Sequence, residues 1–413
     1  MKNLKWILCG LVAIGFIVTG MEGCSSDDSG PTSITLATLT AGGVDLNGAA
    51  SGTDIPVDAP IIATFSTDVD ASTATAANII LTQDYDEQVM DATISVAGKV
   101  VTVTPSADLA GGTLYTLNFT AGLESTNGKA LSALERNFAT EGTFVPSNVI
   151  AHWTFENSTE DVVGTFDPGN AGTDVTYVDS RSATAGKAAS FNGTTTIIEV
   201  PNGNQLMSHN DFTLSFWVKA DGSKEGHFVM GLAGWYGFQF EIAGGAWTAV
   251  DKGVKIATRY QLASTTDAED TWWNGQANGW QGSLFAKVSD GAIGTTFKDK
   301  WANVVCTYDA ASKVGSMYVN GEKVRAWDFD QWPDGDAKKG ATGVTFAGNT
   351  TGGGNNLAFG FIQASGNRKI SDTWADPSDP ANNHFKGLLD DVRVFSRAIT
   401  ATEVTLIYNS EKP

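Results

Sequence analysis

Cysteine is scarce in this chain of 413 residues, which contains only Cys9, Cys24 and Cys306. Two of them lie near the N-terminus, and Cys306 lies in a predicted strand, VVCTYD, where a lone cysteine usually behaves as a small buried hydrophobe. The sequence therefore offers no disulfide framework of the kind that stabilises small secreted domains. Histidine is also scarce, and the four histidines do not have the spacing of metal ligands.

The usual signatures of catalysis are missing as well. The sequence has no G-x-S-x-G motif, phosphate-binding loop or paired-cysteine motif. Glycoside hydrolases need two carboxylates that flank the scissile bond, but the sequence has no Glu-x-Asp-x-(x)-Glu run, the form in which such acids commonly lie on one face of a strand. The densest acidic clusters, residues 84–87 and 267–270, lack the strand context that this chemistry requires. We therefore predict that the protein is not an enzyme.

Basic residues are outnumbered by acidic residues. Lys and Arg number 26 against 46 Asp and Glu, so the formal net charge is −20. This charge argues against nucleic acid and anionic membrane surfaces as partners, and it permits bound calcium. A hydrophobic fraction of 42% and 46 glycines favour a protein of two or three domains built from short strands and turns.

The N-terminus has the features of an export signal. Lys2 and Lys5 precede an uncharged run, Trp6 to Met21, that is shorter than the roughly 20 residues of a membrane-spanning helix. The segment Met21-Glu22-Gly23-Cys24, followed by SSDDSG, resembles the lipobox and export signal of Bacteroidetes-type surface lipoproteins. The resemblance implies a signal peptide at 1–23, lipidation of Cys24, a polar tether at 24–33 and a lipid-anchored protein exposed on the outer membrane. The alternative is a plain secretory peptide with an incidental cysteine.

Residues 34–145 consist of short alternating strands separated by turn signals, which is typical of a β-sandwich. Examples are PIIATFS (60–66), KVVTVTP (99–105) and TLYTLNF (113–119). The stretch DIPVDAPIIATFSTDVDASTATAANIIL resembles a bacterial Ig-like domain of S-layer and surface proteins. That resemblance implies a spacer in which Leu109 and Tyr115 form a packed corner.

The segment 148–413 has a second set of motifs. They are IAHWTFENSTEDVVG, KAASFNGTTTIIEVPN, DFTLSFWVKA, WANVVCTYDAASKVGSMYVNGEKV and HFKGLLDDVRVFSRAITATEVTLIY. In this order they resemble the laminin-G-like, concanavalin A-type lectin domain of bacterial surface proteins. The fold class implied is all-β, with an Ig-like sandwich followed by an antiparallel concanavalin A-like jelly roll. Asn320-Gly321 independently predicts a tight hairpin, because both residues tolerate positive φ. In DFTLSFWVKA, strand alternation predicts that Phe212, Leu214, Phe216 and Val218 line one face.

Two insertions, 221–300 and 325–383, exceed what this scaffold needs and hold most of the 12 tryptophans. A flat indole can cover the apolar face of a sugar while nearby amides and carboxylates bind its hydroxyls. The segments TWWNGQANGW and RAWDFDQWPDGD have this mixture. We therefore predict a carbohydrate platform, whose members are Trp272, Trp273, Trp280, Trp327 and Trp332. The alternative is that these rings pack the insertions onto the sandwich.

Asp390 is the candidate metal ligand. Strict alternation places it on one strand face with Leu388, Val392 and Val394, and Asp391 with Arg393 on the other. A carboxylate among apolar neighbours needs a hydrogen bond or a cation. The resemblance implies a structural calcium, with Glu156 as the second ligand; the alternative is that backbone N–H groups or an arginine satisfy Asp390.

Together these features predict a non-catalytic, glycan-binding surface lipoprotein. An Ig-like stalk presents a lectin-like head that captures polysaccharide, and the membrane is contacted only through the lipid. Two alternatives stay open. The head could bind a surface protein as an adhesin or structural component, or it could be a glycoside hydrolase or lyase.

Overall fold

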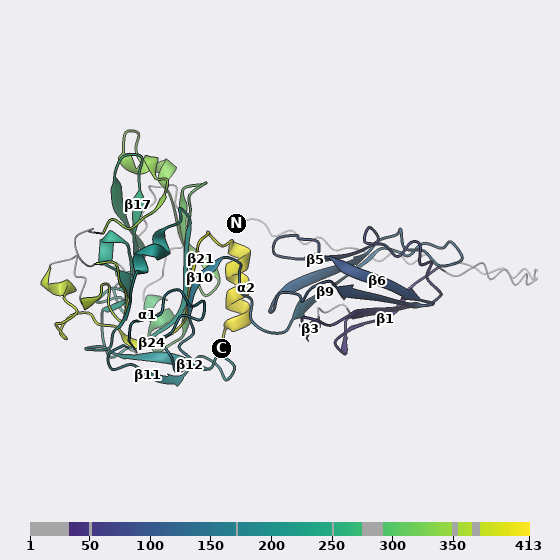
Figure 1. Ribbon diagram of the computed structural model, residues 1–413, viewed down its shortest axis with the longest axis horizontal. Coiled ribbons are helices and arrows are strands. Elements are labelled where there is room, and N and C mark those ends of the chain that lie inside the picture. The colour runs from purple at the N-terminus through teal and green to yellow at the C-terminus, as the bar shows by residue number, and fades with distance from the viewer. Residues whose placement is uncertain are drawn as a thin grey trace, which may run out of the picture.

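The computed structural model describes residues 33–48, 52–170, 172–249, 252–274, 292–348, 354–365 and 372–413. Within these ranges the chain forms two β-sandwiches, with a C-terminal helix lying between them (Figure 1). The predicted all-β class, with an Ig-like sandwich followed by a concanavalin A-like sandwich, is confirmed. None of the helices in the described ranges has the length and apolar character needed to cross a membrane.

The first sandwich packs a five-stranded sheet, ordered β2-β1-β4-β7-β6, against a four-stranded sheet, ordered β3-β9-β8-β5. Alternate residues of these strands point inward and build a core of their own. Leu109 and Tyr115 both belong to it, and the Tyr115 hydroxyl accepts from Ala110 N and donates to Gln83 Oε1, each at 2.8 Å. The strands are β1 (Leu36–Ala41), β2 (Val44–Asp45), β3 (Gly52–Ile55), β4 (Ile61–Phe65), β5 (Ile79–Gln83), β6 (Ala92–Ala97), β7 (Val100–Pro105), β8 (Leu114–Phe119) and β9 (Leu134–Thr140).

The second sandwich has two larger sheets. The eight-stranded sheet is ordered β11-β12-β24-β14-β19-β20-β21, with β10 also paired to β24. Its strands are β10 (Val149–Trp153), β11 (Thr176–Asp179), β12 (Lys187–Asn192), β14 (Phe212–Ala220), β19 (Ala302–Asp309), β20 (Val314–Val319), β21 (Glu322–Asp328) and β24 (Lys386–Phe395).

The seven-stranded sheet is ordered β13-β23-β15-β16-β17-β18, with β22 paired to β17. Its strands are β13 (Ile198–Val200), β15 (His227–Leu232), β16 (Phe238–Ile242), β17 (Gly253–Gln261), β18 (Thr266–Asn274), β22 (Gly343–Val344) and β23 (Leu357–Phe359). The acidic cluster 267–270 lies on β18, so the prediction that it lacks strand context is wrong. Short helical segments connect the strands of this domain: η1 (Gly203–Met207), η2 (Gly234–Tyr236), α1 (Ala292–Phe297), η3 (Phe329–Gln331), η4 (Ala337–Gly340) and η6 (Thr373–Ala375).

The central strand β14 follows the predicted alternation. Its residues Phe212, Leu214, Phe216 and Val218 all lie in the core between the two sheets. Trp217 points to the other side of the sheet, where its ring stacks on Tyr408 at 6.0 Å between centroids. Since one face of β14 enters the core and the other meets a helix, the strand is buried on both sides.

Strand β24 departs from the predicted alternation at one residue. Its pairing with β14 shifts register between Ser215 and Trp217, and Asp391 has a positive φ of 45°. This β-bulge reverses the side on which later residues project, so Leu389, Val392 and Val394 all enter the core. The prediction that Asp390 shares a face with Val392 and Val394 is therefore wrong, because it assumed an unbroken strand.

Helix α2 (Ala401–Glu411) begins at a capping box. Thr400 Oγ1 accepts from Glu403 N at 3.2 Å, and Glu403 Oε2 accepts from Thr400 N at 2.8 Å. The helix buries Val404 and Ile407 against the outer face of the eight-stranded sheet. Its position next to the first sandwich makes it part of the contact between the domains (Figure 1).

Two aromatic rings from the Ig-like side complete this contact. Phe144 joins the same apolar cluster as α2, and the ring of Tyr85 meets it edge-on at 5.0 Å. The Phe144 N–H donates to Ser410 Oγ at 3.2 Å. The two domains are therefore joined through an apolar cluster that includes the C-terminal helix as well as by the linking chain.

Candidate functional site

The two tryptophans predicted on 271–280 and included in the structure point to opposite sides of β18. Trp273 is 8% exposed and packs in the core, with its ring 6.3 Å from that of Phe297. Trp272 is half-buried on the outer face, where Lys255 Nζ lies 5.0 Å from its ring centre. Neighbouring residues of a strand cannot share a face. Trp272 is thus available to an outer-face site, Trp273 belongs to the core, and Trp280 lies outside the described residues.

Trp327 and Trp332 are also core residues. Each is only 3% exposed, and the Trp332 ring stacks on Phe329 at 4.6 Å with an interplanar angle of 10°. The Trp327 ring fills the space above Gly315, where an added Cβ would meet its atoms at 2.1 Å. A sugar cannot reach rings in these positions, so the prediction that they form part of an exposed platform is wrong. These tryptophans have polar neighbours in the sequence because they lie in a loop that packs onto the sandwich.

A different group of side chains gathers on the outer face of the seven-stranded sheet. Register pairs Glu241 on β16 with Lys255 on β17, and Lys255 with Trp272 on β18. These three side chains form one row across three strands. Their inward neighbours, such as Phe240, Val254 and Trp273, belong to the core, so the row faces away from it.

Lys255 is the centre of the row. Its ammonium lies 3.0 Å from Glu241 Oε1 and 3.2 Å from Asp270 Oδ2, and its side chain is 5% exposed. The ammonium also lies 5.3 Å from the ring centre of Trp235. Burial raises the pKa of Glu241, and the charge and hydrogen bond of Lys255 oppose that rise. The buried Lys255 ammonium therefore pairs with the carboxylates of Glu241 and Asp270 and lies close to the indole rings of Trp235 and Trp272.

Two tryptophans from the insertions lie beside the row of Glu241, Lys255 and Trp272. Trp235, on η2, donates from Nε1 to Asp270 Oδ1 at 2.8 Å. Trp374, on η6, is 38% exposed and meets Trp235 edge-on at 5.7 Å between ring centroids. Phe228 supports Trp374 from below at 5.9 Å.

The side chains enclose a cavity of about 260 Å³. We call it the Trp235–Trp374 cavity; its walls are Phe228, Trp235, Glu241, Ile242, Ala243, Gly244, Lys255, Trp374 and Asn383. The lining combines indole faces with a carboxylate, an ammonium and an amide. Such a mixture can cover an apolar ligand face and bind hydroxyl groups at its rim.

The sequence contained a partial signal for this cavity. Trp235 and Trp374 lie in the two Trp-rich insertions, but in segments with fewer amide residues around them than TWWNGQANGW. Glu241 is the single charge in FQFEI, and Lys255 is one of two charges in GVKIATRYQ, the other being Arg259. Charged residues on the non-core positions of neighbouring strands indicate an outer face with polar side chains, and that pattern could have identified the row.

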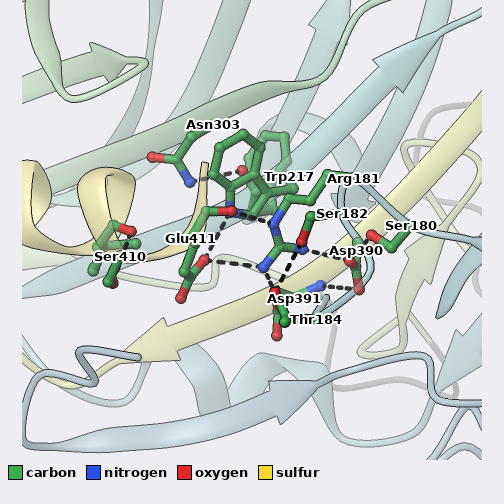
Figure 2. A network of polar contacts seen from close by, with 12 residues as sticks. Ser180, Arg181, Ser182, Thr184, Trp217, Asn303, Asp390, Asp391, Ser410 and Glu411 are labelled. Carbon is green, nitrogen blue, oxygen red and sulfur yellow. Dashed lines mark hydrogen bonds and ion pairs between the residues drawn. The ribbon is translucent and has the colours of Figure 1, made fainter. Parts of the chain in front are cut away.

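The two predicted metal ligands have separate partners. Glu156 is exposed, and its Oε1 accepts from Lys187 N at 2.9 Å. Asp390 is 1% exposed; its carboxylate accepts from the Ser180 hydroxyl and pairs with Arg181 at 2.5 Å (Figure 2). Among the described residues, no group of three or more His, Cys, Asp and Glu side chains has the arrangement of a metal site. The satisfaction of Asp390 by an arginine is the alternative that the sequence left open.

Asp390 is one member of a buried charge network that joins β24 to the end of α2. Burial, and then the charge of Asp391, raise the pKa of Asp390. Asp391 is half-buried, which by itself would raise its pKa, but Arg393, together with His152 and Arg181, outweighs this effect and lowers the pKa of Asp391. The network also includes Glu411, whose Oε1 lies 2.5 Å from Arg393 Nη1.

Comparison with protein families identifies both domains. The family described as bacterial Ig-like domain matches residues 44–144. The family described as the concanavalin A-like lectin/glucanases superfamily matches residues 192–363. The chain therefore combines a bacterial Ig-like domain with a concanavalin A-like lectin/glucanase domain, as the sequence motifs predicted.

Three of the matching solved structures are distant in sequence. Domain 4 of AbnA, an extracellular arabinanase from Geobacillus stearothermophilus solved with arabinotriose, is 20% identical with a TM-score of 0.37; the match covers 63% of this chain and 98% of that domain. The binding domain of Paraclostridial Mosquitocidal Protein 1 is 15% identical with a TM-score of 0.40, covering 64% and 52%. The receptor-binding domain of botulinum neurotoxin type G is 14% identical with a TM-score of 0.37, covering 64% and 51%. The chain thus spans about half the length of the two toxin domains, and no curated protein matches it.

Proposed function

We propose that this protein is a lipid-anchored surface protein whose concanavalin A-like domain binds a glycan, without cleaving it, in the Trp235–Trp374 cavity. The observation that carries the proposal is the meeting of an exposed indole, a second half-buried indole, Lys255 and its ion-pair partner Glu241 around one cavity of about 260 Å³. Capture of polysaccharide at the cell surface is the corresponding role.

The chemistry of the cavity suits a sugar. The Trp374 ring is exposed enough to stack on the C–H face of a pyranose or furanose ring. Glu241 and the Asn383 amide line the same cavity and can accept or donate to ring hydroxyls. Because Lys255 fixes both Glu241 and Asp270, the acceptor groups are positioned before a ligand arrives, which lowers the entropy cost of binding.

The same pairing supports binding without cleavage. A glycosidase needs one carboxylic acid that donates a proton and a second carboxylate that acts as nucleophile or base. Glu241 and Asp270 share one ammonium, and Asp270 also accepts from Trp235. Glu241 is therefore engaged with Lys255 and Gln239, and Asp270 with Lys255 and Trp235.

The remaining parts of the chain fit a surface role. The N-terminal signal and Cys24 lie outside the described residues, and the lipid anchor rests on the sequence alone. The Ig-like domain lies between that end and the lectin-like domain in the chain. It serves in this proposal as the stalk that holds the head away from the outer membrane.

A binding screen on the full chain tests the proposal. We expect one or more polysaccharides to bind, and Trp374→Ala to weaken that binding about tenfold, which corresponds to about 1.4 kcal/mol. The thermal midpoint should change little, because the Trp374 ring is 38% exposed. Affinity is measured by isothermal titration calorimetry.

Tyr236→Ala is the matched control. Tyr236 is a neighbour of Trp235 on η2 and is 37% exposed, but it does not line the cavity. The control should bind like the wild type. If no polysaccharide binds, or if both variants weaken binding equally, the glycan proposal fails and the protein-binding adhesin takes its place.

A further inference from the structure

We infer that the guanidinium of Arg181 takes the place of a metal cation beside Asp390, so that the concanavalin A-like domain is stable without calcium. Arg181 belongs to the buried charge network under the C-terminal helix, which is separate from the Trp235–Trp374 cavity. Its role does not depend on glycan binding.

Arg181 lies just after β11 and reaches three carboxylates (Figure 2). Its Nη1 is 2.5 Å from Asp390 Oδ2, and its Nη2 is 2.6 Å from Asp391 Oδ2 and 3.4 Å from Glu411 Oε2. Its Nε donates to the Glu411 carbonyl at 2.9 Å. The side chain is only 4% exposed, and it lies over the Trp217 ring at 4.8 Å. The cation is therefore enclosed by negative groups from two different elements.

Both carboxylate oxygens of Asp390 already have partners within the protein. Asp390 Oδ1 accepts from Asp391 N at 2.8 Å, and its Oδ2 is held by Ser180 and Arg181. Calcium needs six to eight oxygen ligands at about 2.3–2.6 Å. It could reach Asp390 only by displacing the arginine.

The other two carboxylates are engaged in the same way. Asp391 Oδ1 lies 2.8 Å from His152 Nε2 and 3.1 Å from Arg393 Nη2. Glu411 Oε1 lies 2.5 Å from Arg393 Nη1, and Glu411 Oε2 accepts from Trp217 Nε1 at 2.7 Å. Glu156, the second calcium ligand predicted, accepts from Lys187 N instead and has no contact with this network. The donor set thus fits an arginine-centred cluster and does not fit a calcium site.

The arginine also has a mechanical role that a calcium ion would share. It joins β24, through Asp390 and Asp391, to the last residue of α2, through Glu411. Buried charges are stable only when they are paired and hydrogen-bonded, and removal of one partner leaves the rest uncompensated. Without Arg181, three carboxylates would face one another with Arg393 as the main remaining cation.

Thermal unfolding of the full chain tests the inference. Tryptophan fluorescence follows this domain selectively, because apart from Trp6 every tryptophan lies between residues 153 and 374. We expect the wild-type midpoint to agree within about 1 °C in millimolar calcium and in excess EDTA, since a ligand that does not bind the native state does not stabilise it. A fall of several degrees in EDTA overturns the inference.

Substitutions separate the charge of Arg181 from its packing. Arg181→Ser should lower the midpoint by about 10 °C, and calcium should restore part of that loss by binding the exposed carboxylates. Arg181→Lys keeps a cation, so its loss should be smaller and calcium should have no effect on it. If calcium acts no differently on Arg181→Ser than on the wild type, the inference is overturned.

Lys187→Met is the matched control. Lys187 forms a nearby ion pair with Asp179 at 2.6 Å, but the two side chains are 37% and 90% exposed. The bond from its backbone N–H to Glu156 survives the substitution. Its midpoint should lie within about 2 °C of the wild type, because exposed pairs contribute little. A loss as large as that of Arg181→Ser would refute the special role of the buried network.

Discussion

His227 should make the stability of the concanavalin A-like domain depend on pH. Its imidazole is completely buried at the start of β15, with the ring 5.8 Å from those of both Phe385 and Trp247. The Nε2 atom lies 3.2 Å from the Lys224 carbonyl, and Nδ1 accepts from Lys386 N at 3.3 Å. One nitrogen donates and the other accepts, so the neutral ring is the form that fits.

The magnitude follows from the pKa of this residue. Burial lowers the pKa of His227 from 6.5 to about 4, and the bond to the Lys224 carbonyl opposes the shift. Between these values the unfolded chain binds more protons than the native domain, so stability falls as the pH falls. The stability that comes from keeping His227 neutral is fully present above pH 6.5. About 3 kcal/mol of it is lost by pH 4, at 1.36 kcal/mol for each pKa unit. About 2 kcal/mol of it is lost between pH 7 and pH 5.

Urea unfolding of the full chain at pH 7 and pH 5, followed by tryptophan fluorescence, measures this loss. His227→Gln keeps a donor and an acceptor on an uncharged side chain. Between pH 7 and pH 5, the free energy of unfolding of this variant should therefore fall by about 2 kcal/mol less than that of the wild type. Exposed His209, changed to Gln, is the matched control and should leave the pH dependence unchanged. Equal pH slopes for the wild type and His227→Gln would refute the reasoning.

Two further predictions follow from the burial of Trp332 and from the N-terminal signal. Trp332→Ala should lower the free energy of unfolding by about 3–5 kcal/mol, because it removes a core ring stacked on Phe329, and should leave glycan affinity intact in the folded fraction; a selective loss of affinity would contradict its core position. Cys24→Ala should release the protein from the membrane fraction and abolish labelling with radioactive palmitate, and equal labelling of the variant would rule out lipidation at this position.

Local patterns predicted much of the second domain correctly. The alternation in FTLSFWVKA placed Phe212, Leu214 and Phe216 on the core side of β14, as the structure has them. The Asn320-Gly321 pair joins β20 to β21 with φ values of 52° and 80°. Both features depend on residues within a few positions of one another, which is why the sequence alone was sufficient.

Features that depend on distant contacts were not predictable in this way. The bulge at Asp391 exists because Arg181 and His152, more than 200 residues earlier, hold its carboxylate. Nothing in LLDDVRVF itself marks the break in alternation. Similarly, Trp327 and Trp332 have the same polar neighbours in the sequence as a sugar platform would have, and only the packing of Phe329 and Gly315 against them makes them core.

The two outer faces of the concanavalin A-like sandwich carry different chemistry, and this division limits where a ligand can bind. On the eight-stranded sheet, helix α2 and Phe144 cover the part of the outer face that Val305, Tyr318 and Phe395 form, and Arg181 closes the charge network beside it. On the seven-stranded sheet, the outer face carries the Trp235–Trp374 cavity. A glycan that approached the part of the first face under α2 would have to displace the helix and uncover paired charges, whereas the second face offers an exposed indole and fixed polar groups at no such cost. A ligand on the second face would leave the contact with the Ig-like domain undisturbed.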